Sequence, residues 1–149
     1  YTMPFLHQQV KLEIKRAERY SRPFTMMLIQ LSNMDELNSN YGRIVLLNLL
    51  RELGKIINEG TRVTDIPARQ SEAELLFLLP ETRIEDAGII ADRIRKNAER
   101  FKYKLRLNIC LVEYPRSGSV FEDLFAGLTV AMSRCIEKGG DKTISFIRE

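Results

Sequence analysis

The sequence predicts an α+β fold with a β-α-β-β-α-β core, and three features of the chain lead to this prediction. The first is a short apolar run at 24–31, typical of a buried strand, followed by a long apolar helix at 36–57. The second is a pair of closely spaced strands between 64 and 80. The third is a helix at 83–100 followed by a polar–apolar alternation at 104–112. In this order, called ferredoxin-like, both helices cover one face of a mainly antiparallel sheet.

A further helix is expected before this core. Residues 5–20 place Leu6, Val10 and Ile14 on one face, which is the pattern of an amphipathic helix. The Ser-Arg-Pro sequence that follows ends it, because proline disfavours helical geometry in the residue before it. The chain then enters the first strand.

Two capping boxes are expected at the starts of the core helices. Ser32 with Asp35 resembles such a box for the first helix, and Thr82 with Glu85 resembles one for the second. In the second helix the apolar residues recur at alternating steps of three and four, which indicates one buried face.

The two strands between these helices are expected at 64–70 and 73–80, joined as a hairpin. Pro67 cannot donate a hydrogen bond to a neighbouring strand, so the first of them is predicted to be an edge or irregular strand. Beyond the core, a helix at 119–137 ends at a Gly-Gly pair, and a short strand follows at 143–147.

Length and composition indicate one domain. The chain has 149 residues, of which 44% are hydrophobic, so it can bury a sizeable core. It opens without a methionine and almost at once in a helical pattern, from which we expect residues 1–149 to be a single domain of a larger multidomain protein.

The charge and cysteine content exclude several classes of function. The net charge of +3 is small and dispersed, which does not favour nucleic-acid binding. No apolar run is long enough to span a bilayer, so we expect a cytoplasmic domain that meets a membrane only through other domains. Cys110 and Cys135 lack the spacing of a metal site and are expected to be buried, reduced thiols.

Four segments resemble one known family. The segment ARQSEAELLFLLPET is similar to the RYGGDEFALLLPET-type hairpin of GGDEF domains, the diguanylate cyclases of bacterial signalling. Upstream, IQLSNMDELNSNYG resembles the family's DIDxFKxINDxYG segment. Downstream, AGIIADRIRKN and AMSRCIEKGGDKTISF resemble its ADxIR helix and its ALYxAKxxGxNxV ending. Together the segments cover nearly the whole chain, and they imply the fold of GGDEF domains and nucleotidyl cyclases.

The family signature is degenerate in this chain. In an active member, two glycines let the GTP phosphates approach the hairpin backbone closely, and a metal-binding carboxylate follows them. A glutamate at the second glycine position adds a side chain and a negative charge where the polyphosphate would lie. The signature positions here are Ser71, Glu72, Ala73, Glu74 and Leu75.

The resemblance also implies that the metal and substrate sites are lost. The family's metal-binding carboxylates fall on Gln30, Ser32 and Ala73, none of which is anionic, whereas Mg²⁺ prefers anionic oxygen ligands. Of the two guanine-reading residues, Asn38 matches the family and Leu47 does not. We therefore expect no cyclase activity and no Mg²⁺ cofactor.

A second motif of the family is kept. Many members carry an inhibitory site for the product, cyclic di-GMP, marked by Arg-x-x-Asp five residues before the signature. That spacing selects Arg62 and Asp65, and the gap-free match places the site's further arginine at Arg93. An arginine fork can bind O6 and N7 of guanine, a carboxylate can accept from the base's N–H donors, and arginines suit the phosphates.

The Arg-x-x-Asp pattern is common, and Arg83 with Asp86 form a second copy expected to be a solvated surface pair. The sequence favours a receptor that binds cyclic di-GMP, also as an intercalated dimer, and passes the signal to other domains or a partner protein. Two alternatives stay open. One is a ligand-free scaffold or dimerisation domain, and the other is a GTP-sensing regulatory domain.

Overall fold

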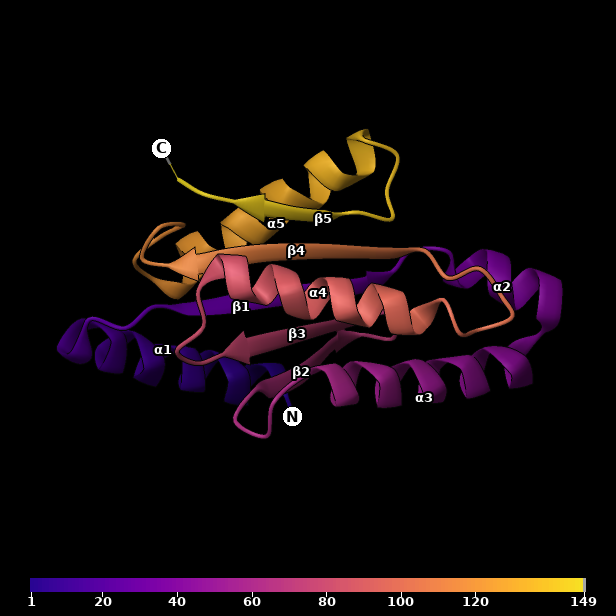
Figure 1. Cartoon of the computed structure of the whole chain (residues 1–149), viewed down its shortest axis with the longest axis horizontal. Helices are drawn as coiled ribbons and strands as arrows, with labels where there is room; N and C mark the ends of the chain where they lie inside the picture. The colour runs from indigo at the N-terminus through magenta and orange to yellow at the C-terminus, as the bar shows by residue number, and fades with distance from the viewer. Residues whose placement is uncertain (149) are drawn as a thin grey trace.

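The structure is a computed structural model that describes residues 1–148, and it has the predicted β-α-β-β-α-β core (Figure 1). The core is preceded by one helix and followed by a further helix and strand, as expected. The first strand of the structure spans 24–31, the same residues as the strand predicted from the sequence. The elements are α1 (Met3–Tyr20), β1 (Phe24–Leu31), α2 (Met34–Tyr41), α3 (Arg43–Gly60), β2 (Ile66–Ser71), β3 (Glu74–Leu79), α4 (Ile84–Ala98), β4 (Leu107–Tyr114), α5 (Phe121–Glu137) and β5 (Thr143–Phe146).

The strands form one five-stranded sheet in the order β2-β3-β1-β4-β5. All neighbouring pairs are antiparallel except β4 and β5, which are parallel. β2 lies at one edge of the sheet, as the presence of Pro67 predicted, and its pairing with β3 becomes irregular between Arg69 and Ser71. The hairpin therefore reaches its turn with an altered register.

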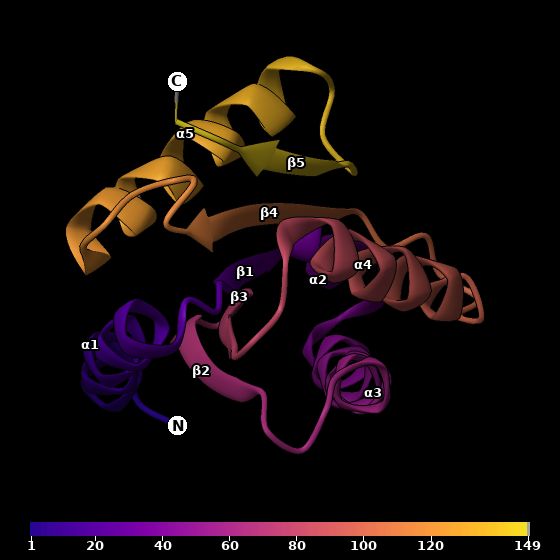
Figure 2. The same ribbon diagram turned by 60° about the vertical axis from the view of Figure 1, so that its left-hand side comes forward.

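Helices cover both faces of the sheet and create two hydrophobic cores. Because side chains alternate along a strand, β1 sends Met27, Ile29 and Leu31 to one core and Met26 and Leu28 to the other. The first core contains α3 and α4, and the second contains α1 and α5 (Figure 2). The expectation that both helices of the βαββαβ core share one face is confirmed.

The helix expected at 36–57 is instead two helices. Gly42 interrupts it with φ 86°, a left-handed backbone conformation that glycine adopts without steric cost. Its N–H donates to the carbonyl of Asn38 at 2.9 Å, which ends α2, and α3 starts at the next residue. The unbroken apolar pattern concealed this change of direction.

Both predicted capping boxes are wrong because neither hydroxyl group bonds to the start of its helix. The Ser32 hydroxyl donates to the carbonyl of Arg106 at 3.2 Å, and the Thr82 hydroxyl donates to the carbonyl of Pro80 at 2.9 Å. The N-cap residues Asn33 and Arg83 make no side-chain cap, and the Ile84 N–H donates to Glu113 Oε2 at 3.4 Å. The strand expected at 104–112 begins later, at 107, because the Asn33 side chain binds the backbone of residues 104 and 106.

Within residues 1–148, no helix combines the length and apolar character that crossing a membrane requires. Cys110 and Cys135 are buried and free, as expected. Burial raises the pKa of the Cys110 thiol to about 12, so this group stays a protonated, unreactive side chain near neutral pH.

Candidate functional site

Arg62 and Asp65 close the turn that leads from α3 into β2. The Asp65 N–H donates to the Arg62 carbonyl at 3.0 Å, and the Arg62 N–H donates to Asp65 Oδ2 at 2.7 Å. The Asp65 side chain is 0% exposed, so its carboxylate lies inside the turn. The motif therefore folds as a local unit in which the aspartate fixes the backbone of the arginine.

The Arg62 guanidinium is held by one of its nitrogens. Nη2 donates to Asp65 Oδ1 at 3.2 Å, to the Pro80 carbonyl at 2.9 Å and to the Thr82 hydroxyl. Its Nε and Nη1 groups have no hydrogen-bond partner among residues 1–148, and the side chain is 50% exposed. Arg62 is thus positioned from one side while two of its donor groups face no protein acceptor.

Arg93 lies on α4 in the same layer as this turn. The next residue, Ile94, is buried, and a Cβ added to Gly60 would lie 3.0 Å from Ile94 Cγ1. α4 therefore passes against the end of α3, two residues before Arg62. Arg93 is exposed, and its side chain makes no hydrogen bond or ion pair with any described residue. The structure therefore joins Arg62 to Asp65 directly, and no such contact links Arg93 to either of them within residues 1–148.

The second copy of the motif is arranged differently. Arg83 and Asp86 are both exposed at the start of α4, and no ion pair joins them in the described part of the chain. The two copies share residue types and spacing, but only the first has a buried carboxylate that orients its arginine.

Gln30, near the end of β1, and Glu74, the first residue of β3, lie where the resemblance places the family's metal site. Gln30 and Glu74 face each other in register, and Gln30 Nε2 donates to Glu74 Oε2 at 3.3 Å. Asn108 Nδ2 donates to Gln30 Oε1 at 2.9 Å, and the Ser71 hydroxyl donates to Glu74 Oε1 at 2.9 Å. The oxygens of Glu74 are thereby bonded to the chain itself.

This hydrogen-bond network continues to the segment before β5. The Asp141 N–H donates to Asn108 Oδ1 at 2.7 Å. Burial opposes ionisation of the Asp141 carboxyl, but the Leu107 N–H at 2.9 Å and the cations of Lys104 and Arg95 outweigh it and lower the pKa of Asp141. Sequence reasoning did not identify Asn108 or Asp141. The one available signal was a polar residue within a predicted strand.

A salt bridge joins the hairpin turn to the start of α3. Glu72 contacts Arg43, the first residue of that helix, with a 2.6 Å separation between the carboxylate and guanidinium. The Glu72 carbonyl accepts from Arg69 Nη1 at 3.1 Å. The charge expected to repel a polyphosphate is therefore partly neutralised by Arg43, while the glutamate side chain still occupies the turn.

The residues present do not fit a magnesium site. Within residues 1–148 no group of three or more histidine, cysteine, aspartate or glutamate side chains could hold a metal ion. The Ser32 hydroxyl is bonded to Arg106, and Ala73 contributes only its carbonyl, which accepts from the Leu31 N–H. Asn38 and Leu47 are both exposed on the helices nearby.

Comparison with known proteins gives a consistent family match. The family profile described as "Diguanylate cyclase, GGDEF domain" matches residues 3–114. Among curated proteins, the uncharacterized membrane protein YdaK of Bacillus subtilis (strain 168) is 27% identical over 117 residues, covering 72% of this chain and 41% of YdaK. The chain spans only 20% to 41% of the length of the first curated relatives that it matches.

Solved structures resemble the chain in fold. The active GGEEF domain of a diguanylate cyclase from Vibrio cholerae has a TM-score of 0.89 and 17% identity, covering 99% of this chain and 98% of that chain. The GGDEF domain of DgcB from Caulobacter crescentus, solved in complex with c-di-GMP, has a TM-score of 0.81 and 11% identity, covering 93% and 86%.

Proposed function

Since the chain belongs to the GGDEF family, we propose that it acts in cyclic di-GMP signalling as a receptor for the nucleotide and not as a cyclase. The observation that carries this proposal is the state of Arg62. Its guanidinium is fixed through Nη2 by the buried Asp65, yet half of the side chain is exposed. Such an arginine is pre-organised, so little conformational entropy is lost when a ligand binds it.

The chemistry of Arg62 suits a guanine nucleotide. Guanine presents O6 and N7 as neighbouring acceptors, and the planar guanidinium is the side chain that matches such a pair. In this proposal the role of Asp65 differs from the direct contact with the base that the sequence predicts. Both of its oxygens accept from Arg62, so it is a positioning residue that orients the arginine instead of contacting the base.

Arg93 would supply the phosphate contact. It is exposed on α4 and makes no ion pair among the described residues, so binding a phosphate breaks no existing interaction. Arginine binds phosphate oxygens through charge-assisted hydrogen bonds, which are stronger than neutral ones. The related fold of DgcB, solved in complex with c-di-GMP, supports this choice of ligand.

The hairpin turn supports the second half of the proposal. A phosphoryl-transfer site of this kind needs metal ions that neutralise the phosphates. Gln30, Ser32 and Ala73 supply no anionic ligand for them, and Glu74 is already bonded to Gln30 and Ser71. We therefore infer that the chain does not convert GTP to product.

Calorimetric titration with cyclic di-GMP tests the proposal. We expect saturable binding to the wild-type chain with a Kd of about 1 μM or tighter. Arg62→Ala should weaken it at least about 100-fold, because it removes charge-assisted hydrogen bonds from the ligand. Arg83→Ala, which alters the other copy of the motif, should leave the affinity unchanged.

Three results would contradict the proposal or redirect it. Binding that survives Arg62→Ala places the ligand elsewhere. The absence of heat with cyclic di-GMP removes the receptor function and favours a scaffold domain. GTP binding that requires Mg²⁺ and is insensitive to Arg62→Ala favours the GTP-sensing alternative. Thermal unfolding of each variant shows whether the fold is intact.

A further inference from the structure

A cationic pocket lies between α3 and the β2–β3 hairpin, apart from the Arg62 turn. Its volume is about 490 Å³, which is within the range of small-molecule sites, roughly 300–1,000 Å³. Of the signature positions only Leu75 lines it, while Ser71 to Glu74 do not, and neither Asn38 nor Leu47 lines it. Its lining consists of Tyr1, Arg51, Gly54, Lys55, Ile57, Asn58, Pro67, Arg69, Leu75 and Phe77.

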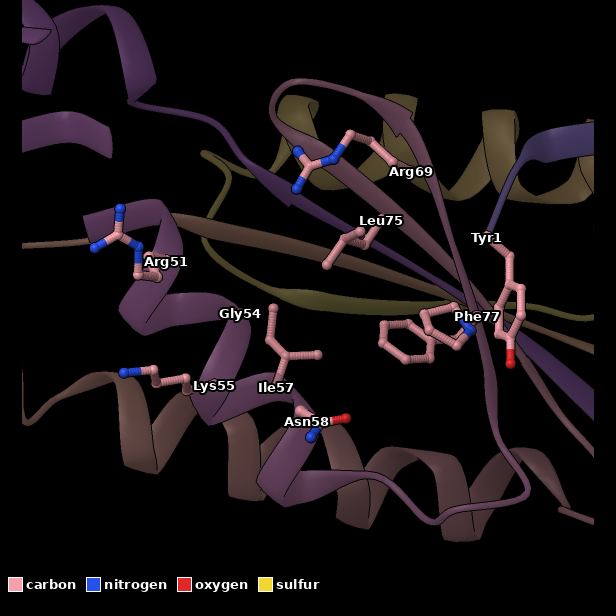
Figure 3. A pocket seen from close by; sticks show the side chains of 10 residues that line it. Tyr1, Arg51, Gly54, Lys55, Ile57, Asn58, Arg69, Leu75 and Phe77 are labelled. Carbon is pink, nitrogen blue, oxygen red and sulfur yellow. The ribbon is translucent and has the colours of Figure 1, made fainter. Parts of the chain in front are cut away.

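The charge of the pocket wall is of one sign. Arg51 and Lys55 come from α3 and Arg69 from β2, whereas no aspartate or glutamate lines the pocket (Figure 3). Arg51 makes no ion pair within residues 1–148, and Arg69 is bonded through Nη1 to a backbone carbonyl. Lys55 alone has a carboxylate partner, Glu52 at 3.2 Å. Two arginines therefore offer uncompensated charge to an anion.

The floor of the pocket is apolar. Ile57, Leu75 and Phe77 line it, with Leu75 next to Arg69 and Phe77 farther from Arg51, and Asn58 offers an amide near Ile57 (Figure 3). Such a surface suits the face of a ring, while the amide can both donate and accept at the ring's edge. An inorganic anion would use only the arginines and leave this floor uncovered.

Gly54 keeps the pocket open. It lies in the interior of α3, where glycine disfavours a helix by roughly 1 kcal/mol relative to alanine. A Cβ added at Gly54 would meet no atom within 4 Å, so packing against the rest of the chain does not require a glycine there. The missing side chain leaves space beside the arginines.

We propose that this pocket is a second ligand site, which binds a nucleoside monophosphate with its phosphate between Arg51 and Arg69 and its base over Leu75 and Phe77. The guanidinium groups match phosphate oxygens, and the apolar floor excludes water from the face of the base. The site shares no residue with the Arg62–Asp65–Arg93 set, so it does not depend on the function proposed above.

Titration with GMP followed by ¹H–¹⁵N NMR tests this site. We expect saturable binding with a Kd below about 1 mM, without a requirement for Mg²⁺, and weakening of at least about tenfold in the Arg51→Gln/Arg69→Gln double variant. Guanosine and inorganic phosphate, the two halves of the probe, should each bind at least about tenfold more weakly than GMP.

A plugged pocket provides the sharper test. Gly54→Met should abolish GMP binding, since the side chain enters the space beside the arginines. Gly88→Met is the matched control, because Gly88 also lies within a helix and a Cβ there meets nothing within 4 Å. Arg62→Ala should leave GMP binding unchanged, which separates this site from the cyclic di-GMP site.

The proposal is overturned if the wild-type chain shows no saturable GMP binding at concentrations up to about 5 mM, where weak affinities are still measurable. It is also overturned if Gly54→Met binds GMP as the wild-type chain does, or if inorganic phosphate alone binds as tightly as GMP. Thermal unfolding of Gly54→Met and Gly88→Met shows whether either variant has lost the fold. If Gly54→Met is unfolded, GMP binding by the folded Arg51→Gln/Arg69→Gln variant tests the proposal instead.

Discussion

The Arg62–Asp65 pair precedes strand β2 and the segment SEAEL begins at its end, and the two regions differ in how their polar groups are satisfied. At its end, Ser71 and Glu74 belong to a network that runs through Gln30 and Asn108 within the chain. Before its start, the Arg62 guanidinium is held through one nitrogen and keeps two donor groups without an acceptor among residues 1–148. Figure 1 shows the turn before β2 and the hairpin end as separate regions.

This difference is the basis for the proposed place of ligand binding. A ligand at the hairpin end would have to displace hydrogen bonds that the chain already makes, which costs their full desolvation. A ligand at the Arg62 turn meets an arginine already oriented by the buried Asp65, so binding and folding are compatible there. We therefore propose that the ligand binds at the Arg62 turn and not at the hairpin end.

The largest expected effect comes from Asp65→Ala. It removes the buried acceptor of both the Arg62 N–H and the guanidinium, so the free energy of unfolding should fall by about 2 kcal/mol. Cyclic di-GMP affinity should fall with it, because Arg62 is no longer oriented. Urea denaturation measures the first effect and calorimetry the second. Asp86→Ala is the control and should change stability by less than about 0.5 kcal/mol.

A loss below about 0.5 kcal/mol for Asp65→Ala would contradict the view that this carboxylate closes the turn. Equal losses in both aspartate variants would also contradict it, since the two copies of the motif would then be equivalent.

Arg93→Ala should act on binding alone. The side chain is exposed and has no partner among the described residues, so the free energy of unfolding should stay within about 0.5 kcal/mol of wild type. Calorimetry should show cyclic di-GMP affinity about tenfold weaker, from the loss of one charge-assisted contact. Lys96→Ala, at another exposed position of α4, should have no effect. Unchanged affinity in Arg93→Ala would remove this residue from the site.

The pH dependence of stability sharpens the view of the hairpin network. The interactions of the Asp141 carboxylate with Leu107, Lys104 and Arg95 lower the pKa of Asp141 in the folded chain. The stabilisation by this carboxylate is therefore full above about pH 4, and it is lost as the pH falls through the pKa of Asp141 in the folded state. Asp141→Asn should therefore be less stable than wild type by about 1 kcal/mol at pH 7, and the difference should narrow below pH 4. Urea denaturation between about pH 3 and 7 measures it. A difference that does not depend on pH would contradict this assignment.

The smallest expected effect is on cyclase activity when the family signature is rebuilt by mutation. Ser71→Gly, Glu72→Gly and Ala73→Asp together should give no product from GTP and Mg²⁺, because Gln30 and Leu47 remain. Chromatographic analysis of the nucleotides tests this prediction. Robust product formation would show that the metal and guanine positions have been assigned incorrectly.

Much of the fold could be predicted because hydrophobic periodicity records which face of an element is buried. The apolar run of β1 and the three-and-four spacing in α4 both gave the correct element. The break at Gly42 was missed, since one residue with positive φ redirects a helix without changing the apolar pattern around it. The capping boxes failed because Ser32 and Thr82 bond to residues distant in sequence, which local spacing does not reveal.

The candidate site could be predicted only at the level of residue identity. Spacing selected Arg62 and Asp65, and the structure places them in direct contact. The spacing did not reveal that the Asp65 side chain faces inward. That orientation goes with the bonds of Arg62 to Pro80 and Thr82, which follow β3 and are distant in sequence. The pocket lined by Arg51 and Arg69 was missed for the same reason, since α3 and β2 meet only in the folded chain.

Amide NMR of the labelled chain during titration with cyclic di-GMP tests the contrast between the two regions most directly. We predict that the amides of Arg62 and Asp65 and those around Arg93 shift with the ligand, with one saturation curve and without Mg²⁺. The amides of Ser71 to Glu74 should stay in place. Shifts centred on the hairpin turn, or no shifts at saturating ligand, would contradict the account.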